Sequence, residues 1–139
     1  MADNLQVLVD LNVILDVLQR REPFYEMSAS VLASVEASRI TGWVAAHSLT
    51  TLFYLLSKHE SADRARVALT ELLNLLSVAP VDHAVIEQAL NLPYQDFEDA
   101  VQMMAAVRVG ADYVITRNPQ DYRQGPLPAL LPAELLALL

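Results

Sequence analysis

Seven acidic or small polar residues in this sequence are placed where they could act on one charged substrate. They are Asp10, Asn12, Asp96, Asp99, Thr116, Asn118 and Asp121. Asp10 directly follows the apolar segment LQVLV (5–9), and Thr116 directly follows the apolar segment 113–115. Both segments are typical of short buried strands, and ligands of open α/β sheets bind beyond the carboxyl ends of the strands. We therefore expect these polar residues to meet at one edge of a sheet.

Asp96 and Asp99 stand three residues apart at the start of a predicted helix, so they occupy neighbouring parts of one helical face. Carboxylates that converge on one pocket repel one another, and hard cations such as Mg²⁺ or Mn²⁺ relieve this repulsion. Such cations also activate water and hold phosphate oxygens during hydrolysis. The three histidines show no zinc spacing and the chain has no cysteine. An oxygen-ligated metal is therefore favoured over zinc.

The hydrophobic periodicity predicts an alternation of strands and helices. Strands are expected at 5–9, 41–45, 77–81 and 113–115, and helices around 13–18, 23–38, 47–59, 61–76, 82–90, 96–109 and from about 132. Pro80 favours an edge position for the third strand, and Gly110 is a typical helix stop. Short apolar strands between helices imply a mostly parallel sheet covered on both faces. We expect one α/β domain over residues 1–139.

The composition limits the classes of partner. A net charge of −8 argues against nucleic-acid binding through a broad basic face, but it permits a nuclease because a bound metal inverts the local charge of an acidic pocket. The 54% of apolar residues suggests that a partner or a second copy covers some apolar surface. No apolar run approaches the ~20 residues needed to span a bilayer. No signal peptide pattern is present either, so we expect a cytoplasmic protein that is not bound to a membrane.

Each polar residue also has a simpler structural interpretation. Asp10 or Asn12 could cap the helix that follows. Asp96 with Asp99 matches a capping pair, because helix N-termini favour acids. Asn118 followed by proline is an ordinary turn signal. The other acids expected on the surface are Asp16, Glu98 and Asp112. The joint placement of the seven residues, rather than any one of them, supports a site.

Four segments resemble the PIN-domain family, specifically the VapC-like toxins of bacterial toxin–antitoxin pairs. They are VLVDLNVILDVL (7–18), HSLTTLFYLL (47–56), DFEDAVQMMAA (96–106) and DYVITRNPQDY (112–122). The resemblance covers nearly the whole chain and implies a three-layer α/β/α PIN-like fold with a short, mostly parallel central sheet. It also implies an endoribonuclease that uses Mg²⁺ or Mn²⁺. Similar proteins are usually homodimers, and many are silenced by a small antitoxin protein that commonly covers the active site.

The resemblance also assigns roles to individual residues. Asp10 and Asp99 would be the metal ligands, and Asp96 or Asp121 would assist catalysis through water. The residues expected to orient ligands or the RNA substrate are Asn12, Thr51, Thr116, Arg117 and Asn118. Arg117 or Arg123 would contact the RNA backbone.

Two positions depart from the family pattern and motivate a second hypothesis. Thr51 stands where the family usually has a glutamate, and Asn118 stands where it usually has an aspartate. Fewer charged ligands weaken metal affinity, so the alternative is a PIN-fold module that binds RNA or protein with weak or no catalysis. A third class is phosphotransfer through Asp10, as in response-regulator receivers or haloacid dehalogenase phosphatases. Those proteins generally use a late lysine, whereas Lys58 is the only lysine here.

Overall fold

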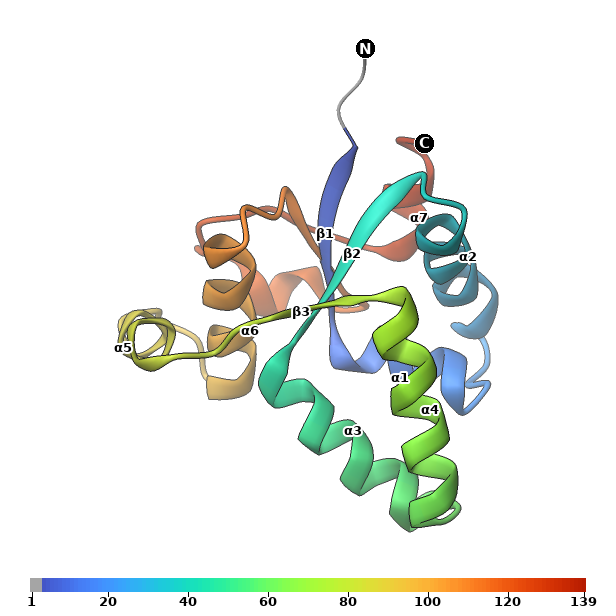
Figure 1. The fold of residues 1–139 in the computed structure, drawn as a ribbon. Helices are drawn as coiled ribbons and strands as arrows, with labels where there is room; N and C mark the ends of the chain where they lie inside the picture. Colours follow the sequence, from blue (N-terminus) through green and yellow to red (C-terminus); the bar gives the residue numbers. More distant parts are fainter. Residues whose placement is uncertain (1–3) are drawn as a thin grey trace.

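The computed structural model describes residues 4–139, which fold around a five-stranded parallel sheet (Figure 1). The strands are β1 (Leu5–Val9), β2 (Ile40–Ala45), β3 (Ser77–Ala79), β4 (Tyr113–Ile115) and β5 (Ala129–Leu130). The α-helices are α1 (Leu11–Leu18), α2 (Tyr25–Glu36), α3 (Ala46–His59), α4 (Ala62–Leu75), α5 (His83–Leu90), α6 (Phe97–Arg108) and α7 (Pro132–Leu136), and Pro119–Tyr122 forms the short 3-10 helix η1. The strand order is β3–β2–β1–β4–β5, and every neighbouring pair is parallel.

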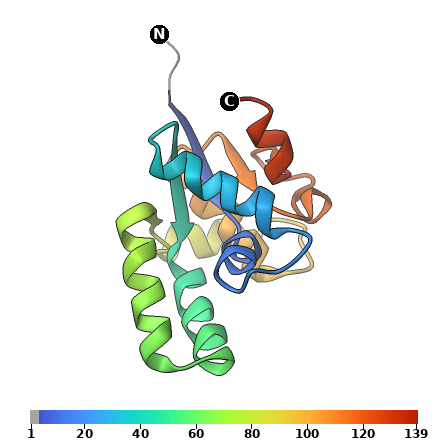
Figure 2. The same cartoon turned by 90° about the vertical axis from the view of Figure 1, so that its right-hand side faces the viewer.

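The two faces of the sheet build two separate cores, because side chains alternate along a strand. Val7 and Val9 point into a core shared with α1 to α4 and α7. Leu8 points into the opposite core, which α5 and α6 complete. Figure 1 shows α5 and α6 on one side of the sheet and α2 and α7 on the other. In the view of Figure 2, the packed pair α3 and α4 extends away from the sheet. The predicted three-layer fold is therefore confirmed.

Local signals place the helix boundaries. The Ser61 side chain accepts from the N–H of Arg64 at 3.1 Å and caps α4. The Asp82 carboxylate accepts from the N–H of Val85 at 3.1 Å and caps α5. Gly110 follows α6 with φ +73°, a left-handed conformation that glycine adopts without steric cost. Gly110 is the expected helix stop, and the two caps stand at the residues where the sequence predicts the helices 61–76 and 82–90 to begin.

The strand β5 was not predicted. It has only two residues and lies in a proline-rich tail, so neither alternation nor length marks it in the sequence. Pairing with β4 supplies its hydrogen bonds: the Thr116 N–H donates to the Leu130 carbonyl at 2.9 Å. The edge position predicted for β3 is confirmed, and the strand ends just before Pro80, two residues earlier than predicted.

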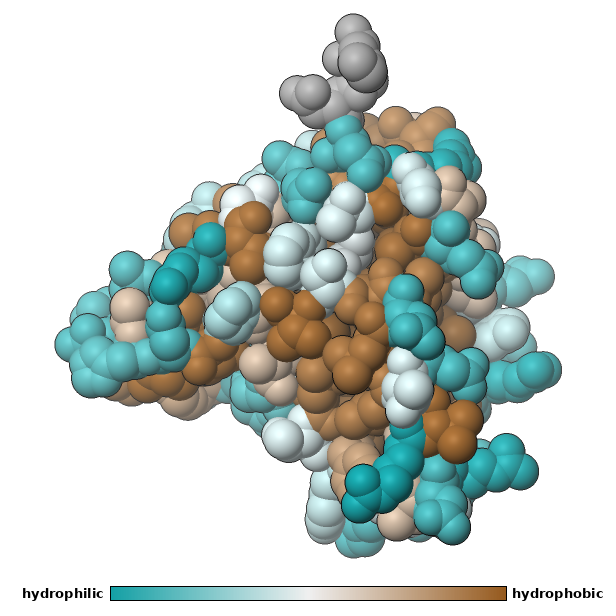
Figure 3. Space-filling view, viewed as in Figure 1, coloured by the Kyte–Doolittle hydropathy of each residue, from teal (hydrophilic) through white to brown (hydrophobic). Residues whose placement is uncertain are grey.

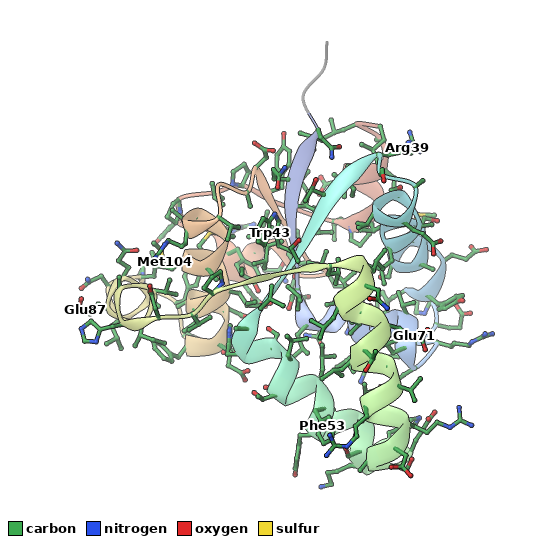
Figure 4. All side chains as sticks on the ribbon, viewed as in Figure 1. Arg39, Trp43, Phe53, Glu71, Glu87 and Met104 are labelled. Carbon is green, nitrogen blue, oxygen red and sulfur yellow. The ribbon has the colours of Figure 1, made fainter. Side chains whose placement is uncertain are left out.

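The molecular surface is partly hydrophobic. On the face that carries α4, hydrophobic side chains gather (Figure 3). Two residues of α4 itself, Val67 and Leu73, are more than half exposed. On the sheet, Trp43 of β2 lies beside β1 (Figure 4), where its indole N–H donates to Gln6 Oε1 at 2.8 Å. Among residues 4–139, no helix combines the length and the hydrophobicity needed to span a membrane.

Candidate active site

Asp10 lies where β1 ends and α1 begins, next to the end of β4. Its N–H donates to the Ile115 carbonyl at 2.9 Å, and its carboxylate caps α1 by accepting from the Asn12 N–H at 3.4 Å. The Thr116 hydroxyl donates to Asp10 Oδ2 at 2.7 Å. Only 4% of the Asp10 surface is exposed. The neighbouring parallel strands β1 and β4 thus bring Asp10 and Thr116 together, as expected from the sequence, and Asp10 also serves as a helix cap.

Gln102 connects Asp10 to the opposite layer of the fold. This residue is 3% exposed, and its Nε2 donates to Asp10 Oδ1 at 3.1 Å and to Tyr122 Oη at 2.9 Å. Its Oε1 accepts from the Leu11 N–H at 3.3 Å and lies 3.5 Å from the Ser48 hydroxyl. These contacts use both donors and the acceptor of the amide. The side chain therefore has one orientation, with its donor end facing the carboxylate of Asp10.

Tyr122 continues this network to Asp99. Its hydroxyl accepts from Gln102 and donates to Asp99 Oδ1 at 3.1 Å. Burial raises the pKa of Tyr122 far above its usual range, and the neighbouring carboxylates Asp10 and Asp99 raise it further. The phenol therefore stays protonated and remains a hydrogen-bond donor. A continuous chain of side chains links Thr116, Asp10, Gln102, Tyr122 and Asp99.

The pKa of the Asp99 carboxyl is strongly perturbed. It is raised from 3.8 to about 7, chiefly by burial and then by the charges of Asp96, Asp10 and Asp121, while the hydrogen bond from Tyr122 lowers it. Near neutral pH, ionising Asp99 is therefore opposed both by desolvation and by like charges. A bound cation would relieve both effects.

The donor set fits a hard divalent cation. Asp10 and Asp99 offer carboxylate oxygens, which Mg²⁺ and Mn²⁺ prefer. Within residues 4–139, no three acidic or histidine side chains converge as a ready-made metal cage. Mg²⁺ usually binds through one or two carboxylates and keeps several of its waters. Asp10 and Asp99, which the hydrogen bonds of Gln102 and Tyr122 connect, provide two such carboxylates.

The remaining acids of the predicted site are more exposed. Asp96 caps α6, since its Oδ1 accepts from the Glu98 N–H at 2.9 Å and from the Asp99 N–H at 3.4 Å. Asp121 lies on the surface, and its negative charge raises the pKa of Asp99. Thr51 lies on α3, where its hydroxyl donates to Glu98 Oε2 at 3.3 Å. Glu98 is exposed, as expected from the sequence.

The TRN segment 116–118 folds onto the end of β4. The Asn118 N–H donates to Thr116 Oγ1 at 3.1 Å, which fixes the hydroxyl that binds Asp10. Arg117 turns to a different set of partners. Its Nε lies 3.0 Å from Asp16 Oδ2 without an aligned N–H···O hydrogen bond, and its guanidinium stacks 4.1 Å from the ring centre of Phe24.

Asp16 corrects the sequence-based expectation of a surface residue. It is fully buried on α1, because the helix turns this position inward toward Arg117 and α2. Burial raises the pKa of Asp16, whereas the positive charges of Arg117 and Arg21 lower it. The ion pair joins α1 to the TRN segment, so Arg117 anchors the backbone that presents Thr116.

Two central residues of the site, Gln102 and Tyr122, were not predicted. Gln102 had a detectable signal, because it is a polar side chain within the apolar run VQMMAA, three residues after Asp99 on the same helical side. Tyr122 had no comparable signal. The residue is 2% exposed, and in a sequence such an aromatic residue is interpreted as core packing.

Comparison with known proteins agrees with this geometry. The family model described as PIN domain matches residues 6–120. Ribonuclease VapC1 from Aquifex aeolicus (strain VF5) is 26% identical over 122 residues, covering 84% of this chain and 84% of that protein. A chain of a toxin–antitoxin complex from Klebsiella pneumoniae superposes with a TM-score of 0.69 at 20% identity, covering 91% of this chain and 97% of that chain. VapC20 from Mycobacterium tuberculosis, described as a sarcin–ricin loop cleaving toxin, gives a TM-score of 0.62 at 17% identity, covering 78% of this chain and 86% of that chain.

The family match spans most of the chain and contains β1 except its first residue, β2 to β4, Asp10, Asp99 and the TRN segment. The superpositions on solved structures reproduce the same fold over most of the length of those chains. The resemblance seen in the sequence is thereby confirmed, and the chain belongs to the PIN-domain family.

Proposed function

We propose that this protein is a divalent-metal-dependent endoribonuclease and the toxin component of a type II toxin–antitoxin pair. The observation that carries the proposal is the pairing of Asp10 and Asp99 through buried Gln102 and Tyr122, with the pKa of Asp99 raised to about 7. A carboxyl group whose pKa is raised by burial and by neighbouring negative charges, near the carboxyl ends of parallel strands, is typical of a functional site. The ribonuclease relative from Aquifex aeolicus supports RNA as the substrate.

In this proposal Asp10 and Asp99 hold Mg²⁺ or Mn²⁺. The chemistry that such a cation supplies when bound is activation of water and neutralisation of charge on the scissile phosphate. Thr116 and Gln102 fix the two oxygens of Asp10, and Tyr122 fixes one oxygen of Asp99. Asn12, in the first turn of α1, and Asn118, just before η1, orient ligands or substrate. Asp96 or Asp121 assists through water.

Metal binding is the first property to test. Mn²⁺ is titrated by calorimetry into the wild type, Asp10→Ala and Asp99→Ala, with Glu71→Ala on the exposed face of α4 as the matched control. We expect stoichiometric binding in the wild type and the control, and loss of binding in both site variants. Binding that survives both site substitutions would contradict the proposed ligands.

RNA cleavage tests the activity itself. Total RNA and defined structured RNAs are incubated with Mg²⁺ or Mn²⁺, and the new 5′ ends are mapped. We expect cleavage at few positions, abolished by EDTA and by Asp10→Ala. Equal cleavage by Asp10→Ala and the wild type would refute the mechanism.

A second function has its own observation in favour. Thr51 is neutral and hydrogen-bonded to exposed Glu98, and Asn118 uses its N–H to hold Thr116. A PIN-fold module that binds RNA or protein without useful catalysis needs no further acids at these two positions. RNA affinity that is indifferent to EDTA, with no cleavage of any RNA, would favour this function.

The proposed partner is a small antitoxin protein. The Klebsiella pneumoniae structure that this chain resembles is a toxin–antitoxin complex, and the exposed hydrophobic side chains on the α4 face would be covered by a protein partner. Co-purification with the product of an adjacent small reading frame tests this. Homodimerisation and a cytoplasmic location remain predictions.

A further inference from the structure

A cavity of about 450 Å³ lies beside Asp99, between the loop that precedes α6 and the segment 119–124. One part of its lining is acidic and consists of Asp96, Asp99 and Asp121. This part belongs to the candidate metal site, since the charges of Asp96 and Asp121 act directly on Asp99. The cavity therefore opens from the place where the scissile phosphate would lie.

The rest of the lining has a different chemistry. It consists of three residues with side-chain amides, Gln95, Gln120 and Gln124, together with Pro93, Tyr94 and Arg123. An amide presents a donor and an acceptor in one plane, which matches the edge of a nucleobase. Aromatic rings and guanidinium planes stack on unpaired bases. This combination suits a base rather than a second phosphate.

Electrostatics lead to the same choice. The protein carries a net charge of −8, and within residues 4–139 Arg123 is the one basic residue that lines the cavity. Nucleic-acid affinity from phosphate contacts depends on many basic residues, and this part of the wall offers a single one. Binding energy at this place must therefore come from stacking and from hydrogen bonds to a base edge.

Tyr94 is held rigidly enough to act as a stacking surface. Its hydroxyl donates to the Tyr122 carbonyl at 2.8 Å, and the two rings meet edge to face at 88° with centres 6.0 Å apart. Gly125 permits this position, because a Cβ there would lie 2.0 Å from Tyr94 Oη. A preorganised ring loses little conformational entropy when a base stacks on it. Tyr94 also packs on the same Tyr122 that holds Asp99, so base and phosphate positions are coupled.

We propose that this cavity is a subsite for one unpaired nucleobase of RNA, adjacent to the phosphate that is cut at Asp99. Tyr94 stacks on the base, and the amides of Gln95 and Gln124 read its edge. The proposal rests on the proposed ribonuclease function, and it adds the substrate feature that this function recognises: a single-stranded residue of preferred base identity next to the cleavage position.

Equilibrium binding tests the subsite without requiring cleavage. Fluorescein-labelled hexaribonucleotides of A, C, G and U are titrated with the full-length protein in Ca²⁺, and anisotropy is recorded. We expect one base to bind about tenfold more tightly than the weakest. Tyr94→Leu should weaken the preferred hexamer about tenfold, whereas Tyr54→Leu, a substitution of an exposed tyrosine on α3, should leave it unchanged.

A second variant separates recognition from folding. The double variant Gln95→Leu and Gln124→Leu changes two exposed side chains, and it should flatten the base preference while the matched control Gln88→Leu on α5 retains it. Equal affinity for all four hexamers, or a preference that the double variant keeps, would overturn the proposal. Competition by free nucleoside 5′-monophosphates as strong as by the hexamer would indicate a mononucleotide site and overturn the RNA subsite.

The outcomes distinguish this inference from the proposed function. If Asp10→Ala keeps full Mn²⁺ binding, the metal mechanism fails, yet the base preference and its loss in the double variant can still be measured. If Mn²⁺ binding depends on Asp10 but all hexamers bind alike, the subsite fails and the metal site stands.

Discussion

Replacement of Asp99 by asparagine should stabilise the metal-free protein at pH 8. Burial and the charges of Asp96 and Asp10 raise the pKa of Asp99 to about 7, so folding opposes ionisation of this carboxyl group. Stability from the protonated form is complete below about pH 4 and is lost as the pH rises through about 7, because the unfolded chain ionises first. The amide introduced by Asp99→Asn would keep an oxygen that accepts from Tyr122, and it would carry no charge.

The size of the effect follows from the shift. A change from 3.8 to about 7 is roughly three pKa units, and each unit corresponds to about 1.4 kcal/mol. The upper bound is therefore about 4 kcal/mol. Because Asp99 is only partly buried, solvent screening reduces this figure, and we expect a gain of about 1–2 kcal/mol for Asp99→Asn at pH 8.

Urea denaturation in EDTA at pH 5 and pH 8 measures this gain. The advantage of Asp99→Asn over the wild type should grow between the two pH values, whereas the control Glu71→Gln on exposed α4 should show no such growth. Excess Mn²⁺ should reverse the order at pH 8, since ligand binding stabilises only the folded protein that retains the site. If Asp99→Asn is less stable than the wild type at pH 8 in EDTA, the inferred cost of ionising Asp99 in the folded protein is contradicted.

Three further substitutions test the framework around the site. Arg117→Leu should lower the free energy of unfolding in urea by about 3 kcal/mol, because it leaves the buried Asp16 carboxylate without its cation. The double variant Arg117→Leu and Asp16→Leu should lose less than Arg117→Leu alone. An equal or larger loss would contradict the pairing. Gln102→Leu should lower the free energy of unfolding by about 2–3 kcal/mol and weaken Mn²⁺ binding in calorimetry, because Asp10 loses a hydrogen-bond donor and the Leu11 N–H loses its acceptor. Unchanged metal affinity would argue against a positioning role for Gln102. Gly42→Ala should cost about 1–3 kcal/mol in the same denaturation assay, because its Cβ would lie 2.6 Å from the nearest side-chain carbon, and a neutral result would show that this core can relax.

Most of the fold could be predicted because its signals are local. The apolar runs of β1 and β4, the caps Ser61 and Asp82, and the stop at Gly110 act within a few residues of one another. The strand β5 could not be predicted, since a two-residue strand depends entirely on the neighbour that pairs with it. The strand forms only because β4 lies beside it in the folded protein, and no hydrophobic periodicity in the sequence predicts it.

The sequence indicated the polar residues at the ends of the strands and the acids that open α6, but not the side chains that connect them. Asp10 and Thr116 follow adjacent parallel strands, so topology alone brings them together. The burial of Asp16 and the link through Tyr122 depend on which way a side chain turns after packing. In the sequence these two residues are an ordinary helical acid and an ordinary aromatic residue. Residue spacing in the sequence could therefore not predict contacts such as the one between Asp99 and Tyr122.

The Gln102–Tyr122 link also bears on the two neutral positions, Thr51 and Asn118. Four ionised carboxylates around one point would each raise the cost of folding without metal, since like charges repel strongly in a partly buried site. On the alignment inferred from the sequence, Thr51 and Asn118 stand at two of those positions and are uncharged, and the Gln102 amide and the Tyr122 phenol contact Asp10 and Asp99. Part of that repulsion would then be absent from the metal-free protein, while burial and the remaining charges still raise the pKa of Asp99, an effect that a divalent cation would relieve. Lower metal affinity, rather than loss of the site, is the consequence expected from this arrangement.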